Sequence, residues 1–280
     1  MLPAGFDPGE PTAGSLFGHD TIRITDVKDR FLRNSVICGT IHSVRRADRK
    51  DGKNMKRMGK TQLLAGAGFL TAFLLWTLFV RCLDVQAIGP NGTKVGFATF
   101  NLWFHRLTGV HMSICTITDW FGLVPICVCF CFGAVGAAQT IGRRSLLRVD
   151  PDIILLGLYY ILVVIGYLVF EMVPINYRPV LIDGALEASY PSSTTLLVLS
   201  VMPTLKYQID RRASKPFVRG MVGMFVTVFS AFMVIGRLIS GVHWATDIIG
   251  AVLLSMGLFL LYRYAADTVY HRREDTDGIQ

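Results

Sequence analysis

The sequence predicts an all-α polytopic membrane protein, with six transmembrane helices in one bundle and both termini in the cytoplasm. The first observation is composition: 52% of the 280 residues are hydrophobic and only 17% are charged, against roughly a quarter charged in soluble domains. The second is that several apolar runs reach the roughly 20 residues that a helix needs to cross a bilayer. The third is an uneven distribution of Lys and Arg among the segments that join these runs, which sets the orientation.

Six apolar runs account for the predicted spans. The second run is longer than a span requires, and we expect its polar start, HMSICTITDWFG, to lie at the membrane interface. The loop before it, 84–112, contains FNLWFHRLTGVH, whose mixture of aromatic and basic residues is typical of an interfacial helix. The predicted spans are 62–83, 113–140, 152–173, 191–208, 220–238 and 245–264.

Orientation follows from the positive-inside rule. With the N-terminus inside, only five of the 28 Lys and Arg residues fall on the outer side, namely Arg81, Lys94, Arg106, Arg178 and Arg237. The formal net charge of +8 is therefore mostly a cytoplasmic fringe that faces anionic headgroups, and it indicates no nucleic-acid partner. The six cysteines show no zinc-ligand spacing, so we interpret them as apolar packing residues.

Three segments follow from these predictions. Residues 1–60 are expected to form a weakly ordered cytoplasmic extension, with a possible short amphipathic helix in the middle and a polybasic end, RRADRKDGKNMKRMGK. Residues 61–266 hold the six-helix membrane domain, and residues 267–280 form a cytoplasmic tail. We find no internal repeat and no low-complexity segment.

Polar residues gather at the outer ends of four consecutive predicted spans. Ionisable side chains at membrane depth are costly, and for that reason they often mark a functional site. Because these residues lie at one depth on one side of the membrane, the sequence predicts that they form a common site. They are Arg178, Ser192, Ser193, Thr194, Arg237, His243 and Asp247.

The residue types favour phosphate chemistry. His243 and Asp247 are four residues apart, so we expect Asp247 to accept a hydrogen bond from one imidazole nitrogen and leave the other free to attack. Arg178 and Arg237 can each bind an oxyanion by paired hydrogen bonds. The segment PSSTT opens a helix, whose free N–H groups and dipole also favour a phosphate. An alternative remains open, in which Arg237 and Asp247 form a structural ion pair.

These residues resemble the motifs of the type 2 phosphatidic acid phosphatase superfamily, the membrane lipid phosphatases related to vanadium haloperoxidases. That family carries Lys-x6-Arg-Pro, then Pro-Ser-Gly-His, then Ser-Arg-x5-His-x3-Asp. This chain matches Arg178-Pro179 in the first motif, Pro191-Ser192 in the second, and GRLISGVHWATD in the third. The agreement in order and topology covers about residues 60–265.

The resemblance implies a role for each matched residue. His243 would be the nucleophile that forms a phosphohistidine, and Asp247 would orient it. Phosphate would be bound by Arg178, Arg237, Ser192 and the backbone N–H of Ser193. The reacting headgroup would lie at the outer leaflet.

Three positions depart from the family pattern. Glu171 stands where the first motif has Lys, Thr194 where the second has His, and Gly236 where the third has Ser. The missing His is the residue that would protonate the leaving group, and general acid catalysis contributes roughly 10²–10⁴-fold. His105, His111 and Asp119 are possible substitutes.

The sequence therefore predicts an integral membrane lipid phosphatase that acts at the extracytoplasmic face. Its substrate would be a lipid phosphomonoester or diphosphate, such as phosphatidic acid or an isoprenyl diphosphate. No metal or cofactor is expected, because arginines neutralise the phosphate charge. Two alternatives remain: a lipid phosphotransferase with the same nucleophile, and a catalytically silent lipid-phosphate binding protein, which the changes at Glu171 and Thr194 favour. The sequence does not predict the oligomeric state.

Overall fold

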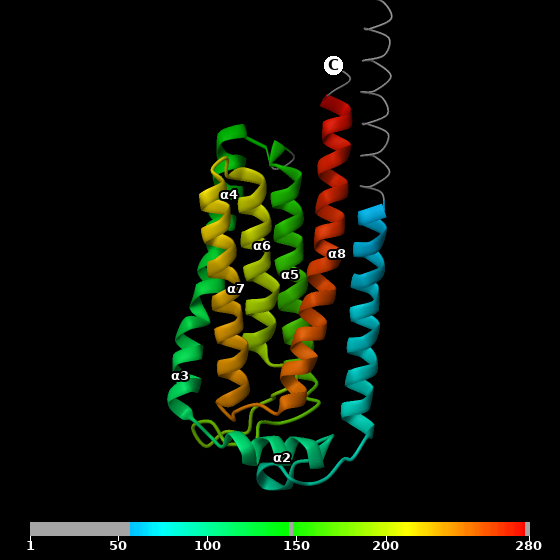
Figure 1. Cartoon of the computed structure of the whole chain (residues 1–280), viewed down its shortest axis with the longest axis vertical. Helices are drawn as coiled ribbons and strands as arrows, with labels where there is room; N and C mark the ends of the chain where they lie inside the picture. Colours follow the sequence, from blue (N-terminus) through cyan, green and yellow to red (C-terminus); the bar gives the residue numbers. More distant parts are fainter. Residues whose placement is uncertain (1–56, 146–147, 278–280) are drawn as a thin grey trace, which may run out of the picture. The chain divides into compact units, whose positions relative to one another are not determined.

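The computed structural model describes residues 57–145 and 148–277, and the regular elements of these ranges are helices (Figure 1). The predicted extension 1–60 lies outside the described residues except for its last four, which already belong to the first helix. In chain order the elements are the first helix Arg57–Cys82, η1 Pro90–Gly92, α2 Ala98–Thr108, α3 Met112–Phe121, α4 Leu123–Arg143, α5 Pro151–Met172, α6 Ser193–Arg212, α7 Pro216–Ile239 and α8 Ala245–Asp277.

Five helical segments of the described ranges are long and apolar enough to cross a membrane, where the sequence predicted six. Their outer faces carry large exposed apolar side chains such as Leu74, Leu158 and Met224, as expected of surfaces that face lipid. The all-helical membrane fold is thus confirmed. The five segments are Arg57–Cys82, Met112–Arg143, Pro151–Met172, Pro216–Ile239 and Ala245–Tyr270.

The helix that differs from this group is α6, the fourth predicted span. It packs against α4, α5, α7 and α8, and its polar residues are buried among those neighbours. The side chain of Gln208 donates to the Tyr262 hydroxyl at 2.9 Å, and the Tyr160 and Thr204 hydroxyls are 2.7 Å apart. Because α6 meets protein on most sides, its side chains need not be apolar, and its composition falls short of a lipid-facing span.

The apolar core joins the first helix, α5, α6 and α8. Phe73, Leu156, Leu196 and Leu254 all belong to one buried cluster, and a second cluster lies between α6 and α7 around Met202 and Met233. These contacts hold the beginnings of α6 and α8 beside the end of α7. The core therefore fixes the three helix ends at which the predicted site residues lie.

The second predicted span is divided at Gly122 into α3 and α4. The α3 segment packs on α7, and the contact is close at Gly236, where an added Cβ would lie 2.7 Å from Thr118 Cγ2. Gly236, the residue that departs from the third motif, therefore allows α3 to approach α7. This approach brings Asp119 of α3 next to Arg237.

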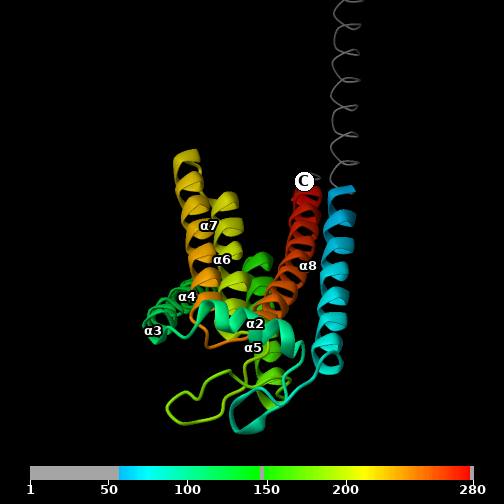
Figure 2. The same ribbon diagram turned by 60° about the horizontal axis from the view of Figure 1, so that its bottom comes forward.

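Helix α2 lies across the ends of the bundle helices rather than along them (Figures 1 and 2). The side chain of Asn101 donates to Thr246 Oγ1 at 2.9 Å, and so ties α2 to the first turn of α8. Beyond α2, the backbone N–H of His111 donates to the Ser240 carbonyl at 2.9 Å. At Gly241 φ is +68°, and an added Cβ would lie 1.9 Å from the Gly109 carbonyl oxygen. The turn between α7 and α8 thus requires glycine at this position.

Candidate active site

His243 lies in the turn between α7 and α8, and only 4% of the residue is exposed. Its Nδ1 is 3.1 Å from the Ser189 carbonyl oxygen, and its Nε2 is 3.0 Å from Nη2 of Arg237. A carbonyl only accepts a hydrogen bond and a guanidinium only donates one. Nδ1 therefore carries the proton, and Nε2 presents its lone pair.

The environment of His243 keeps the ring neutral at pH 7. Burial lowers the pKa of His243 to about 4, and the charges of Arg237 and Arg178 act in the same direction, whereas the Asp247 carboxylate opposes them. A neutral imidazole with a fixed tautomer has the electron pair that a nucleophile needs. The site therefore holds His243 in the form that can attack.

Asp247 is buried beside His243, but it lies too far away for a hydrogen bond. Its Oδ2 is 3.9 Å from His243 Nδ1, beyond hydrogen-bond range, so the Ser189 carbonyl makes the contact that the spacing predicted for Asp247. The carboxylate instead accepts from the backbone N–H of Trp244 at 2.9 Å and from the side chain of Asn176 at 3.2 Å. Asp247 thus caps the start of α8 and acts on His243 through its charge.

Arg237 is 1% exposed and makes contacts with both its amino groups. Nη1 donates to Asp119 Oδ1 at 2.7 Å and to Thr118 Oγ1 at 3.3 Å, while Nη2 faces His243. The structural ion pair considered between Arg237 and Asp247 is therefore not formed, because Asp119 takes that place. The sequence singled out Asp119 only as a possible acid, since its partner is 118 residues away along the chain.

A cavity of about 190 Å³ lies at His243 and brings together residues from α5, the segment between α5 and α6, the start of α6 and the turn between α7 and α8. Arg178 lines it from the segment between α5 and α6, where an antiparallel bridge joins Tyr177 to Ala188. The same bridge places Arg178 opposite Glu187, and Arg178 Nε forms an ion pair with Glu187 Oε2 at 3.0 Å. The lining residues are Tyr167, Phe170, Glu171, Arg178, Glu187, Ala188, Ser189, Tyr190, Pro191, Ser193 and His243.

The three hydroxyl residues at the start of α6 occupy different places. Ser193 lines the cavity of His243. Ser192 is the N-cap residue, and its hydroxyl donates to Thr195 Oγ1 at 3.1 Å. Thr194 lines a neighbouring cavity of about 200 Å³, together with Gly122 and mostly apolar residues. The structure therefore brings Glu171, Arg178, Ser193 and His243 to one cavity. Arg237 and Asp247 are buried next to His243 without lining it, and Ser192 and Thr194 do not line it either.

The two histidines of the segment 84–112, His105 and His111, do not line this cavity. The His105 ring packs near the Trp244 ring, with centroids 5.5 Å apart, and burial lowers the pKa of His105. His111 Nε2 is 2.9 Å from the Thr108 carbonyl oxygen. Neither residue takes the place of the histidine that the second motif lacks.

Two residues of the site were not predicted from the sequence. Ser189 supplies the carbonyl that orients His243, and Glu187 supplies the carboxylate that pairs with Arg178. A backbone carbonyl leaves no signal in residue type. Glu187 stands four residues before Pro191, in the segment between two predicted spans, and its acidic character at that position was the one available indication.

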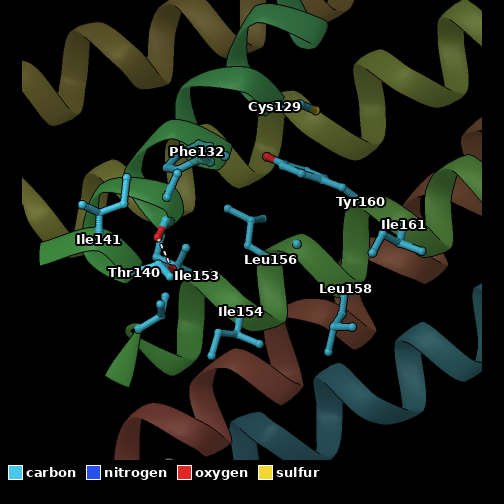
Figure 3. Close-up of a pocket in the computed structure, with 15 residues that line it drawn as sticks. Cys129, Phe132, Thr140, Ile141, Ile153, Ile154, Leu156, Leu158, Tyr160 and Ile161 are labelled. Atoms are coloured by element: carbon cyan, nitrogen blue, oxygen red, sulfur yellow. Dashed lines mark hydrogen bonds between the residues drawn. The ribbon is translucent and has the colours of Figure 1, made fainter. Parts of the chain in front are cut away.

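A larger cavity of about 660 Å³ lies between α4 and α5 (Figure 3). Side chains such as Phe132, Ile153 and Leu156 line it, and Tyr160 reaches into it from α5. Its lining includes no Arg, Lys, His, Asp or Glu. It therefore has no group for phosphate chemistry, and the smaller cavity at His243 is the candidate active site.

Comparison with known families agrees with this assignment. Residues 152–270 match the family model described as the PAP2 superfamily, and this segment contains every predicted site residue from Glu171 to Asp247. This part of the chain is similar to the PAP2 superfamily. The resemblance predicted from the three motifs is thus confirmed. Asp119 lies outside the PAP2 segment, on the helix that packs against it.

The fold is also similar to that of a membrane PAP2 protein of known structure. That structure is the crystal structure of a transmembrane PAP2-type phosphatidylglycerolphosphate phosphatase from Bacillus subtilis, with a TM-score of 0.51 and 18% sequence identity. The match covers 71% of this chain and 94% of the other. At this identity the likeness shows a shared fold alone. A search of curated proteins found no match.

Proposed function

We propose that the protein is an integral membrane lipid phosphatase of the PAP2 type, which hydrolyses a lipid phosphomonoester or diphosphate through a phosphohistidine. One observation carries the proposal: a neutral His243, with Nε2 3.0 Å from Arg237, lies on a cavity that Arg178 also lines. A nucleophile and two guanidinium groups are the parts that phosphoryl transfer to a side chain requires.

The reaction follows from these contacts. The phosphate of the substrate enters the cavity and is bound by Arg178, by Arg237 and by the free N–H groups at the start of α6, beside Ser193. Arg237 then donates from Nη2 to a phosphate oxygen instead of to His243. Nε2 attacks the terminal phosphorus, the bond from this phosphorus to the oxygen of the departing lipid alcohol or lipid phosphate breaks, and a phosphohistidine forms.

Hydrolysis of the intermediate completes the cycle. The attack leaves a positive charge on the imidazole, which the Asp247 carboxylate stabilises from 3.9 Å. Water then attacks phosphorus, and the P–N bond breaks to release phosphate and restore His243. The arginines supply the positive charge at the phosphate, so we propose that no metal takes part.

The leaving group requires a proton unless it is a phosphate. Thr194 does not line the cavity, whereas the carboxyl groups of Glu171 and Glu187 do. When the substrate is a diphosphate, the leaving group is a lipid phosphate, which leaves more easily than an alkoxide, so this reaction depends less on a general acid. An isoprenyl diphosphate therefore suits this site at least as well as phosphatidic acid.

The membrane topology belongs to the same proposal. We place α6 as a sixth span, with both termini in the cytoplasm and the active site at the extracytoplasmic face. The distribution of Lys and Arg supports this orientation. The burial of α6 among α4, α5, α7 and α8 supports its place inside the bundle.

A second candidate function is a silent lipid-phosphate binding protein. The observation that favours it is that both arginines already have carboxylate partners: Arg178 pairs with Glu187, and Arg237 pairs with Asp119. Such a protein would bind lipid phosphates but would not hydrolyse them.

The test is phosphate release by purified full-length protein from phosphatidic acid and from an isoprenyl diphosphate. We expect wild type to turn over at least one of them, and His243→Ala to lose that activity. Wild type no faster than His243→Ala on every lipid would refute the phosphatase. If only the double variant Glu171→Lys with Thr194→His turned over, the silent binding protein would be the correct function. Product analysis with an added lipid alcohol separates hydrolysis from phosphotransfer.

A further inference from the structure

The guanidinium group of Arg237 has a different partner at each of its two amino groups. Nη2 lies 3.0 Å from Nε2 of His243, and Nη1 donates to Asp119 Oδ1 at 2.7 Å. A guanidinium is planar and rigid, so a partner that fixes one amino group also fixes the direction of the other. The contact at Nη1 therefore influences where Nη2 lies relative to the His243 ring.

One face of α3 forms a binding surface for this guanidinium. Cys115, Thr118 and Asp119 stand at positions i, i+3 and i+4, so they lie on the same side of the helix. Arg237 Nη1 contacts all three, at 3.5, 3.3 and 2.7 Å respectively. Cys115 Sγ also donates to Asp119 Oδ2 at 3.3 Å, which holds the carboxylate itself. One turn of α3 is thus arranged around a single cation of α7.

The close packing of α3 on α7 gives Asp119 this reach. A Cβ added at Gly236 would lie 2.7 Å from Thr118 Cγ2, so a larger residue at 236 would hold α3 away from α7. Gly236 immediately precedes Arg237 in the chain. The smallest residue therefore stands where α3 must approach for its carboxylate to meet the guanidinium.

No other carboxylate in the described part of the chain forms an ion pair with Arg237. Asp247 instead accepts from the Trp244 backbone and from Asn176. The Arg237 side chain is 1% exposed, whereas that of Asp119 is 54% exposed, and Arg237 Nε is buried without a hydrogen-bond partner among the described residues. A buried cation that loses its counter-charge is strongly destabilised. Without Asp119, the guanidinium would therefore not keep its present direction.

We propose that Asp119 is a positioning residue for the reaction at His243, a role that rests on the proposed function. It holds Arg237 so that Nη2 lies beside Nε2 of His243, at the place where an oxygen of the attacked phosphate binds. Asp119 does not line the cavity, so it acts through Arg237 and not as a proton donor. It also lies outside residues 152–270, the segment that is similar to the PAP2 superfamily. Helix α3 thus supplies a part of the site that this segment lacks.

Two substitutions at Asp119 separate positioning from acid catalysis. Asp119→Ala should lower kcat by about tenfold to 10²-fold, because small misplacements of a group at the reacting centre have effects of this size. KM should stay within about threefold of wild type, because Arg178 and the start of α6 still bind the phosphate. Asp119→Asn keeps an acceptor oxygen for Nη1 and loses only the charge, so its kcat should stay within about fivefold of wild type. A general acid would lose as much activity in Asp119→Asn as in Asp119→Ala.

A second background separates positioning from a role in packing. Arg237→Lys has a single ammonium group, which Asp119 would hold away from His243. Adding Asp119→Ala to Arg237→Lys should therefore cause no further loss of kcat, and release of the ammonium toward the phosphate should raise kcat by up to about fivefold. If Asp119 only supported the packing of α3, its removal would lower kcat by the same factor in both backgrounds, because independent effects multiply.

Asp152→Ala is the matched control. It removes a carboxylate that pairs with Arg212 at 2.8 Å, at the end of the bundle opposite His243, and kcat should stay within about twofold of wild type. Phosphate release by full-length protein in phosphatidylcholine vesicles gives kcat and KM, and thermal unfolding in detergent checks that the variants fold. Where Asp119→Ala does not fold, Asp119→Ser has the same expected result, because its hydroxyl is too short to reach Nη1.

Three results would overturn the positioning role while leaving the phosphatase intact. They are a kcat of Asp119→Ala within about twofold of wild type, a loss in Asp119→Asn as large as in Asp119→Ala, and an equal loss in the Arg237→Lys background. If no lipid gives His243-dependent turnover, the proposed phosphatase fails, and the same variants are compared by equilibrium binding of phosphatidic acid. Weaker binding in Asp119→Ala that disappears in the Arg237→Lys background would still support the role, and an equal change in both backgrounds would refute it.

Discussion

Charged residues gather at both ends of α6 and α8, yet the two groups are built differently. At the end opposite His243, Asp267 of α8 is the centre of a cluster formed with Gln62, Tyr207, Arg211 and Arg263, here called the Asp267 cluster. Asp267 Oδ1 accepts from Arg211 at 2.6 Å and from the Tyr207 hydroxyl at 2.6 Å, and Oδ2 accepts from Gln62 at 3.1 Å. At the other end, Arg178, Glu171 and His243 surround a cavity.

This difference identifies the condition under which charged residues at the end of a span indicate a functional site. In the Asp267 cluster the donors converge on one carboxylate, and Arg211 also lies over the ring of Tyr207 at 4.5 Å. These contacts join the first helix to α6 and α8, which is a structural role. At His243 the charges instead border an open volume beside a neutral imidazole, the proposed nucleophile. Position at a span end is common to both, so the cavity is what distinguishes the site.

The largest predicted effect is a loss of kcat when Arg237 is replaced, and it tests whether the two ends of the bundle differ in function. Arg237→Lys should lower kcat by roughly 10²–10³-fold, the usual loss when one donor to the reacting phosphate is removed. A single ammonium cannot reach both Asp119 and His243 as the guanidinium does. Steady-state phosphate release measures the effect.

The matched control is Arg211→Lys in the Asp267 cluster. It makes the same chemical change at the other end of the bundle, and kcat should stay within about twofold of wild type, because no reacting group is near. Equal losses in the two variants would mean that the comparison between the two ends is wrong.

The sequence predicted the helices well because their signals are local. Long apolar runs located most of the spans, and the spacing of Arg237, His243 and Asp247 placed the proposed nucleophile, His243, within a single loop and helix. The apolar runs and this spacing each depend on residues that are close together in the chain. The break at Gly122 and the polar composition of α6 concern only how the helices pack.

The remaining parts of the site could not be predicted, because they depend on contacts between distant segments. Asp119 reaches Arg237 through the packing of α3 on α7, and the carbonyl of Ser189 reaches His243 across 54 residues. Whether Glu171 faces the cavity depends on the rotation of α5. Thr194 occupies the expected motif position, yet its side chain lies on the adjacent cavity, and residue type gives no information on that direction.

The next effect is on stability and concerns the Asp267 cluster. Asp267→Asn should lower the free energy of unfolding by about 1–2 kcal/mol, since hydrogen bonds to a charged group are lost at a site that remains partly exposed. kcat/KM should be unchanged. Thermal unfolding in detergent measures the loss. Asp210→Asn, which breaks only the surface ion pair with Lys206, should cost less than about 0.5 kcal/mol, and a loss as large as that of Asp267→Asn would contradict the structural role of the cluster.

The pH dependence tests the environment of His243. Because burial lowers the pKa of this residue to about 4, the nucleophile stays unprotonated as pH falls from 7 to 5.5, and kcat/KM should change by less than about twofold over this range. An ordinary histidine with a pKa near 6.5 would lose about tenfold at pH 5.5. At lipid well below saturation, and after correction for the second pKa of the substrate phosphate at about 6, a steep decline of kcat/KM centred near pH 6.5 in wild type would show that His243 is not buried as described.

The same shift affects stability in a defined direction. The folded-state pKa lies below the unfolded value, so between about 6.5 and 4 the unfolded chain binds the proton and the folded chain does not. Stability is therefore lost as pH falls through this window. His243→Gln should reduce this loss, which chemical denaturation at pH 7 and pH 5 can measure.

The smallest predicted effect separates two adjacent residues of α6. Thr194→Val should leave kcat/KM within about twofold of wild type, because the side chain lies on the apolar cavity beside Gly122 and Val163. Ser193→Ala should lower it by about fivefold, the value of one hydrogen bond to the phosphate. If Thr194→Val were instead the more damaging change, Thr194 would reach the phosphate in the working enzyme, and the separation between the polar and apolar cavities would not hold. If both variants behaved as expected, residue 194 would not supply the proton that the histidine of the family motif would donate. The proton would then have to come from Glu171 or Glu187, which line the cavity, or from water.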